Sequence, residues 1–313
     1  MKTFRKKLLG KASAKETFRE SFIKAQSAME YLMTYGWAIL IIAVVLGALF
    51  ELGVFNANNF APKAPPGACQ VFRPNGPGTT SFINLEGICT GEIPQYVAQF
   101  NGQSSYVQTG INEIPTGSPN VSITAWVTVP IYTSSGCGQE SAFGYGSNSC
   151  NANQADLGLN GNGNVSFASC GNDFFSPLRV ALNTWTFIAA VYTSGATTAT
   201  VYENNKSSTG TLSSDKIISV STPITSWIGA IPSPACLFDG SISNVQIYNT
   251  SLSPNEIQAL YLEGIGGAPI DLQHLVAWWP LNGNANDYSG NDNNGQASNV
   301  NYISNWYSGY TPP

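Results

Sequence analysis

Six cysteines are the residues of this chain with the clearest capacity for covalent chemistry, and all of them follow residue 68. The sequence has no Cys-x-x-Cys pair and a single histidine, His274, so it does not favour a zinc site. An even number of cysteines predicts three disulfides, for which about 15 pairings exist, and buried free thiols are the alternative. Cys69 and Cys89 share one loop-rich segment and are the first pair that we expect. The candidates are Cys69, Cys89, Cys137, Cys150, Cys170 and Cys236.

Acidic and aromatic side chains supply a second set of candidates. Asp239 is a candidate Ca²⁺ ligand together with loop carbonyls, although an aspartate in such a position also caps turns. Asp287 and Asp292 lie in an asparagine-rich loop that either offers oxygen ligands or forms a polar turn. Trp278 and Trp279 are candidates for stacking on a sugar ring, and strand alternation leaves at most one of them free. No motif requires a cofactor, and calcium is the one ion that these residues suggest.

Four Asn-x-Ser/Thr sequons are candidate N-glycosylation sites. They begin at Asn120, Asn164, Asn205 and Asn249.

Charge is distributed very unevenly along the chain. Residues 1–25 hold eight of the 13 Lys and Arg residues and two of the 18 acids, so this end has a net charge of +6 and the remainder −11. A basic end before a hydrophobic helix stays on the cytoplasmic side, which places the acidic remainder outside. The few cations in the remainder argue against nucleic-acid binding.

Residues 31–50 form an apolar run of membrane length. Twenty helical residues at about 1.5 Å each span about 30 Å, the thickness of the hydrocarbon core. A signal peptide is disfavoured because the run is too long and ends in no small-x-small site, whereas a simple signal anchor stays open. Glu30 stands just ahead of the run, where an unpaired carboxylate is costly. A surface position in water is the alternative to a paired role.

The segment Lys24-Ala25-Gln26-Ser27-Ala28-Met29-Glu30 and the helix after it resemble the class III signal of archaeal type IV pilin-like proteins. The resemblance implies cleavage by a prepilin peptidase between Ala25 and Gln26, which makes Glu30 the fifth mature residue. Glu30 would then pair with the new amine of a neighbouring subunit in a bundle of helices. Ala25 replaces the commoner glycine, and Ala28 stands where the family favours serine.

The remainder of the chain is predicted to be mainly β. Apolar and polar residues alternate over 121–129, 184–192 and 241–248, and 155–159 and 165–169 flank an Asn/Gly turn. One helix is expected after the N-cap Ser253, with Glu256 completing a capping box and Gly264 ending the helix. Together these patterns predict a two-sheet sandwich.

Several stretches between residues 95 and 263, among them Phe238-Asp239-Gly240-Ser241-Ile242 and Leu252-Ser253-Pro254-Asn255-Glu256, resemble a laminin G-like, concanavalin A-like domain. The resemblance implies a jelly-roll sandwich that binds glycans or proteins, often with calcium. The paired acids of glycosidases with this fold, Glu-x-Asp-x-x-Glu, are absent, so no catalytic residue is expected. Residues 275–290 resemble the opening of such a domain, and we expect 275–313 to be either a permuted edge strand or a truncated second copy.

The expected organisation is a leader at 1–25, a filament-core or membrane helix at 26–55, a linker at 56–67 and a jelly-roll sandwich at 68–313. The sequence predicts a subunit of an archaeal type IV pilus-like filament, first inserted in the membrane and then displayed on the cell surface. Its expected partners are copies of itself, the prepilin peptidase, the assembly machinery, and glycans or another cell surface. A membrane-tethered adhesin that does not polymerise is the alternative, and a secreted glycan-processing enzyme is the third reading.

Overall fold

The computed structural model describes residues 33, 35–47, 93–110, 112–133, 137–147, 153–169, 171–222, 224–232 and 234–313, together with the backbone of 67–74 and 80–87. The chain divides into two compact units, residues 1–65 and 66–313. Residues 35–47 are helical with exposed side chains. Within the described ranges, no helix combines the length and the hydropathy of a membrane span. The expected processing bond between Ala25 and Gln26, the carboxylate of Glu30, and linker residues 56–66 lie outside the described residues.

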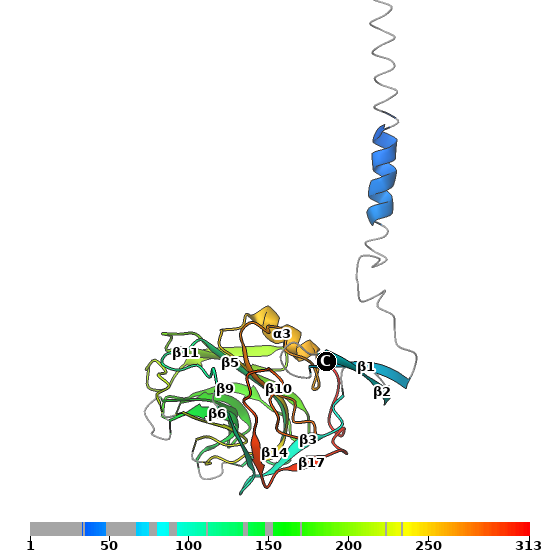
Figure 1. The fold of residues 1–313 in the computed structure, drawn as a ribbon. Coiled ribbons are helices and arrows are strands. Elements are labelled where there is room, and N and C mark those ends of the chain that lie inside the picture. Colours follow the sequence, from blue (N-terminus) through cyan, green and yellow to red (C-terminus); the bar gives the residue numbers. More distant parts are fainter. Residues whose placement is uncertain are drawn as a thin grey trace, which may run out of the picture. The chain divides into compact units, whose positions relative to one another are not determined.

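The second unit is a sandwich of two antiparallel sheets (Figure 1). In the described residues, the larger sheet has the order β12-β11-β10-β5-β14-β3-β17, and β15 also pairs with β14. The smaller sheet has the order β16-β4-β13-β6-β7-β8-β9. A separate antiparallel pair is formed by β1 and β2. The sandwich expected from the sequence is therefore confirmed.

The strand bounds of the larger sheet are β3 Val97–Asn101, β5 Val121–Thr128, β10 Thr186–Tyr192, β11 Thr198–Glu203, β12 Lys206–Thr211, β14 Asp239–Tyr248, β15 Leu275–Trp279 and β17 Asn301–Ile303. Those of the smaller sheet are β4 Tyr106–Thr109, β6 Gln139–Gly146, β7 Gln154–Asn160, β8 Asn164–Ala168, β9 Phe174–Arg179, β13 Thr225–Ile228 and β16 Gln296–Ser298. The separate pair consists of β1 Gly67–Pro74 and β2 Thr80–Gly87.

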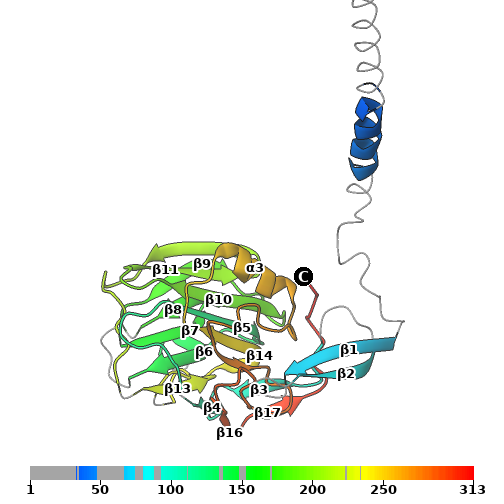
Figure 2. The same ribbon diagram turned by 45° about the horizontal axis from the view of Figure 1, so that its top comes forward.

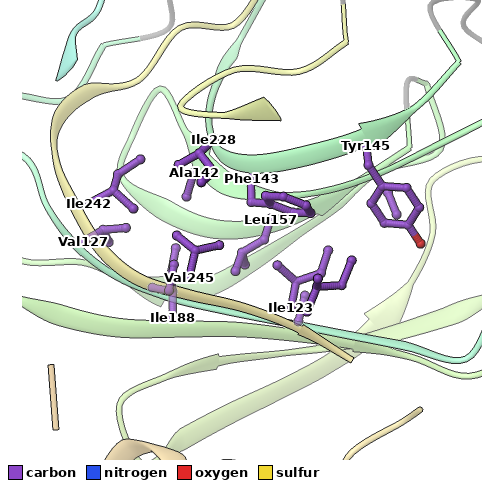
Figure 3. Packing of buried hydrophobic residues seen from close by; sticks show 14 of the residues in the cluster. Ile123, Val127, Ala142, Phe143, Tyr145, Leu157, Ile188, Ile228, Ile242 and Val245 are labelled. Carbon is purple, nitrogen blue, oxygen red and sulfur yellow. The ribbon is translucent and has the colours of Figure 1, made fainter. Parts of the chain in front are cut away.

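The main core lies between the two sheets. Ile123 and Val127 of β5 point into it from the larger sheet, and Phe143 and Leu157 meet them from the smaller sheet (Figure 3). Successive strand residues point to opposite faces, so the alternation of β5 places every second side chain in this core. Trp279 of β15 joins the same core and packs 5.4 Å from Phe143 between ring centroids.

A second apolar layer covers the outer face of the larger sheet. Trp126 of β5 stacks on Tyr261 of the helix α3 (Pro254–Leu262), with ring centroids 6.0 Å apart, and meets Tyr310 at 5.6 Å. Figure 2 shows α3 over this side of the sandwich, near β10 and β5. Because the helix α3 and the C-terminal segment cover the outer face of the larger sheet, this sheet buries side chains on both of its faces.

The helix α3 begins where the sequence predicts. Ser253 accepts a hydrogen bond from the Glu256 backbone amide, and the Glu256 side chain accepts one from the Ser253 amide, which completes the capping box. Pro254 opens the helix, and Gly264 follows its end with a φ of +80°, a conformation that favours glycine.

The C-terminal segment belongs to the sandwich. The strand β14 pairs with β3 along 239–242 and with β15 along 245–248, so two short strands share one side of it. The strands β16 and β17 then extend one edge of each sheet, beside β4 and β3. The first strand of this segment, β15, thus pairs with the same side of β14 as β3 does.

Candidate functional site

Several strand connections gather at one end of the sandwich, which we call the loop end. It comprises residues 101–105, 129–133, 137–138, 160–163, 180–185, 229–232 and 234–238. The Gly161 amide donates to the Gly138 carbonyl over 3.2 Å, and the Asn183 amide donates to the Val129 carbonyl over 2.8 Å. These backbone bonds hold connections from distant parts of the sequence beside one another.

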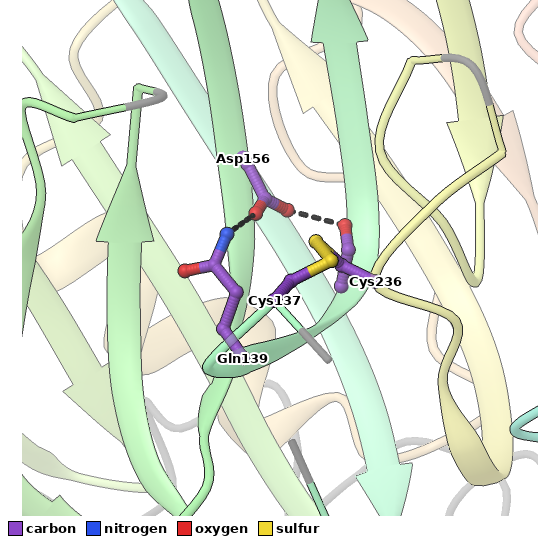
Figure 4. Close-up of a disulfide and its surroundings, with 5 residues drawn as sticks. Cys137, Gln139, Asp156 and Cys236 are labelled. Carbon is purple, nitrogen blue, oxygen red and sulfur yellow. Dashed lines mark hydrogen bonds between the residues drawn. A yellow bond between two sulfur atoms is a disulfide. The ribbon is translucent and has the colours of Figure 1, made fainter. Parts of the chain in front are cut away.

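A disulfide between Cys137 and Cys236 ties the β5–β6 connection to the β13–β14 connection (Figure 4). The two Cα atoms are 5.4 Å apart and the two residues are separated by 99 positions. This bond confirms the prediction of disulfides for one pair of the six candidates. The expected pair of Cys69 and Cys89 lies outside the described side chains, as do Cys150 and Cys170.

A buried carboxyl group lies beside this disulfide. Asp156 of β7 accepts hydrogen bonds from the Ser141 hydroxyl and, over 2.8 Å, from the Gln139 amide nitrogen (Figure 4). Its side chain is 1% exposed, and burial raises the pKa of this carboxyl to about 8. The nearby charge of Asp173 raises the pKa further, whereas the bond from Ser141 opposes the shift. Asp156 therefore acts as a buried structural group.

Two further acids, Glu140 of β6 and Asp239 at the start of β14, lie in contact with each other. The Glu140 carboxylate accepts a hydrogen bond from the Asp239 amide over 3.2 Å. Burial is the main cause that raises the pKa of Glu140 to about 7, and the charge of Asp239 adds to it. Ca²⁺ takes six to eight oxygen ligands. No group of three or more acidic, histidine or cysteine side chains that fits a metal occurs among the described residues, so calcium at Asp239 stays a prediction.

The asparagine-rich loop after β15 is built around Asp287. Its carboxylate accepts hydrogen bonds from the backbone amides of Trp278, Ser289 and Asn293 at 2.8 to 3.0 Å. These donors stabilise the loop conformation through both carboxylate oxygens. The geometry therefore matches the polar-turn reading of this loop.

Both tryptophans of β15 are buried, although the sequence made them candidates for stacking on a sugar ring. Trp278 is 6% exposed and donates its indole N–H to Asn244, and Trp279 is fully buried and donates to the Asn293 carbonyl. Strand alternation does send them to opposite faces. The outer face is covered as well, however, so neither indole offers a face to a sugar ring.

The sequence profile of the concanavalin A-like lectin/glucanases superfamily matches residues 101–258, which is just over half of the 313-residue chain. The chain belongs to this superfamily. The match runs from the end of β3 into α3 and contains the five connections of the loop end. No curated protein matches the chain in sequence.

Several solved structures resemble this superfamily member. The comparison with a candidate carbohydrate binding protein from Bacteroides ovatus gives a TM-score of 0.51 at 13% identity and covers 73% of this chain. This chain spans 64% of the length of that protein. A SAP-like pentraxin from Limulus polyphemus gives 0.47 at 12% identity, covering 69% of this chain and 99% of the pentraxin. The carbohydrate-binding module CBM40 of a Ruminococcus gnavus sialidase, bound to α2,3 sialyllactose, gives 0.42 at 15% identity, covering 55% and 100%. At 13% identity, the likeness to the Bacteroides ovatus structure concerns the fold alone.

The loop end of this superfamily member also carries an arginine that the sequence reading did not select. The guanidinium carbon of Arg179, at the end of β9, lies 4.4 Å from the centroid of the Tyr132 ring. Arg179 is exposed, and Tyr132 is half-buried against the main core. The sequence could have drawn attention to Arg179 because cations are rare in this part of the chain. Residues 93–313 contain three cations and twelve acids.

The four sequons differ in their surroundings. Asn205 lies exposed in the β11–β12 turn, next to Asn204, whose φ is +53°. The Asn164 amide donates to the Ser176 carbonyl over 2.8 Å, and Ser166 of the same sequon is fully buried. The Asn120 side chain, although exposed, accepts a hydrogen bond from the Ser194 amide. Asn249 is exposed at the end of β14.

Proposed function

We propose that this protein is a cell-surface adhesin whose concanavalin A-like sandwich binds saccharides of a partner surface. The observation that carries the proposal is the superfamily match, which includes the whole loop end. The disulfide and the backbone bonds described above hold this end in one conformation, and a preorganised surface binds with a smaller loss of entropy. The Bacteroides ovatus structure, named as a candidate carbohydrate binding protein, has the same fold.

The positions of the buried acids favour binding over glycan processing. A glycosidase needs one carboxyl group that protonates the leaving oxygen and a second one that attacks or activates water. Glu140 is buried and accepts from the Asp239 amide, and Asp156 is enclosed by Ser141 and Gln139. Neither carboxyl group can reach a glycosidic oxygen in this arrangement. The enzyme reading therefore remains the third one.

Because of its N-terminal segment, we propose that the protein is displayed on the cell surface as a subunit of a filament. The support is the sequence itself, namely the basic leader, the Ala25–Gln26 bond and Glu30 ahead of the apolar run. After cleavage, Glu30 of one subunit would pair with the Gln26 amine of its neighbour, which offsets the cost of a carboxylate in hydrocarbon. The subunit would be inserted in the membrane first and assembled into an extracellular filament afterwards. A tethered adhesin with an intact leader is the alternative.

Two measurements test these proposals separately. A glycan array probed with the purified full-length protein tests binding, and a complete lack of saccharide binding would refute the adhesin proposal. Mass spectrometry of surface filaments tests processing, for which we expect an N-terminus at Gln26. In Glu30→Ala cells we expect exported protein without filaments, whereas a normal filament yield would remove the role of Glu30.

A further inference from the structure

We propose that Arg179 and Tyr132 form a binding site for a carboxylate-bearing saccharide at the loop end. This inference rests on the proposed saccharide binding and names the ligand class within it. The relevant group is a uronate or sialate carboxylate, which has the same planar shape in both sugars.

The Tyr132 ring is held from three sides. Its hydroxyl donates to the Val180 carbonyl over 2.7 Å. Gly163 lies against the ring so closely that a Cβ atom built there would be 2.1 Å from a ring carbon. The guanidinium of Arg179 covers the ring as well, at 4.4 Å from its centroid. A cation over an aromatic ring is attracted by about 0.5–1 kcal/mol at an exposed site. Tyr132 is therefore a fixed platform that limits where Arg179 can point.

Arg179 has no acidic partner among the residues that the structure describes. The ion pairs there are Lys206 with Glu203, at 3.0 Å, and His274 with Asp271. An arginine that carries an exposed guanidinium in a domain rich in acids would ordinarily find one of them at close range. The guanidinium instead keeps its N–H donors available to a ligand from solution.

The chemistry of this group favours carboxylates. A guanidinium presents five N–H donors in a planar fork and binds a carboxylate through two parallel hydrogen bonds. Lysine offers a point charge and cannot reproduce that geometry. The surrounding connections add contacts suited to a sugar ring, namely the exposed Asn162 amide and the exposed apolar side chains of Ile131 and Leu182.

The acidic composition of the domain does not prevent this binding. At physiological ionic strength, exposed charges more than about 8 Å apart are largely screened. A carboxylate at the loop end therefore responds mainly to the guanidinium that it touches. The same argument predicts that raising the salt concentration weakens binding of acidic sugars and leaves binding of neutral sugars nearly unchanged.

The test is titration calorimetry of the full-length protein with three probes. Trigalacturonic acid and 3′-sialyllactose supply the two sources of carboxylate, and lactose is the neutral reference. The variants are Arg179→Gln, Arg179→Lys and Tyr132→Leu. Lys206→Gln is the matched control, because it removes the same charge from an exposed lysine that already has a carboxylate partner. Thermal unfolding of each variant checks that the sandwich is intact.

We expect at least one acidic probe to bind about tenfold or more tightly than lactose, and Arg179→Gln to lose that preference. Arg179→Lys and Tyr132→Leu should each lose part of it, and Lys206→Gln should keep it. An acidic preference that survives in Arg179→Gln overturns the inference. Saccharide binding without any preference for acidic probes also overturns it but leaves the adhesin proposal standing. If the unmodified protein binds no saccharide on the array or in solution, both proposals fall.

Discussion

Replacing the buried carboxyl group of Asp156 by an amide should remove most of the loss of stability that accompanies a rise in pH. In the folded protein the pKa of Asp156 is raised from 3.8 to about 8 because the group is buried. The folded state therefore holds more protons than the unfolded state between about pH 4 and pH 8. Stability must fall as pH rises through this window. The variant Asp156→Asn has no proton to lose at this site and should lack that decline.

The size of the change in stability follows from the shift in the pKa of Asp156. Each unit of pKa difference corresponds to about 1.4 kcal/mol, so a shift of about four units sets a ceiling of roughly 5 kcal/mol between pH 4 and pH 8. Water penetration and local relaxation reduce this, and we expect Asp156→Asn to gain about 2–3 kcal/mol at pH 8. At pH 5 it should lose about 1 kcal/mol, because its amide nitrogen faces the Gln139 donor and one amide must turn.

Urea unfolding of the oxidised full-length protein, followed by tryptophan fluorescence at pH 5 and pH 8, measures both values. Glu263→Gln is the control, since Glu263 is an exposed acid at the end of α3. Glu140, with a pKa of about 7, titrates in the same window and leaves part of the decline in the variant. The reasoning is refuted if Asp156→Asn declines with pH as steeply as the unmodified protein, or if the unmodified protein gains stability toward pH 8.

Three further predictions concern features that the structure describes directly. Replacing both Cys137 and Cys236 by serine should lower the free energy of unfolding by about 3 kcal/mol, since the bond closes a long loop, and the loss should show in urea titrations at constant pH. Glycopeptide mass spectrometry of protein from its native cells should find a glycan on Asn205 and none on Asn164, whose amide is engaged and whose sequon serine is buried. Ser253→Ala removes the capping box of α3 and should cost about 1 kcal/mol, measured by thermal unfolding against the unmodified protein.

Local patterns in the sequence predict the elements whose stability is decided locally. The alternation in 121–129 and 241–248 matches β5 and β14 because each has one face in the main core. The capping box at Ser253 predicts the start of α3 because its hydrogen bonds join residues only three positions apart. The periodicity of apolar residues in the strands and the helix is therefore sufficient to predict the sandwich.

Features that depend on contacts between residues far apart in the sequence cannot be predicted from such local patterns. The alternation rule places one of Trp278 and Trp279 inward and leaves at most one free, but Trp278 is covered as well because a second apolar layer lies outside the larger sheet. The disulfide partner of Cys137 lies 99 positions away, and nothing in the local sequence distinguishes it from the other candidates. Arg179 at the end of β9 and Tyr132 in the β5–β6 connection are 47 positions apart in the sequence, and only the folded sandwich brings them together.

The charge that a ligand meets at the loop end differs from the charge that the sequence suggests. Residues 93–313 contain twelve acids and three cations, so the composition alone suggests a domain that is negatively charged throughout. Near pH 7, however, burial keeps Asp156 largely protonated and Glu140 partly so, because their pKa values are about 8 and about 7. Arg179 remains charged and exposed at the same end. Burial thus removes negative charge beneath the loop end while its surface keeps a cation, and the proposed binding of an acidic sugar relies on this combination.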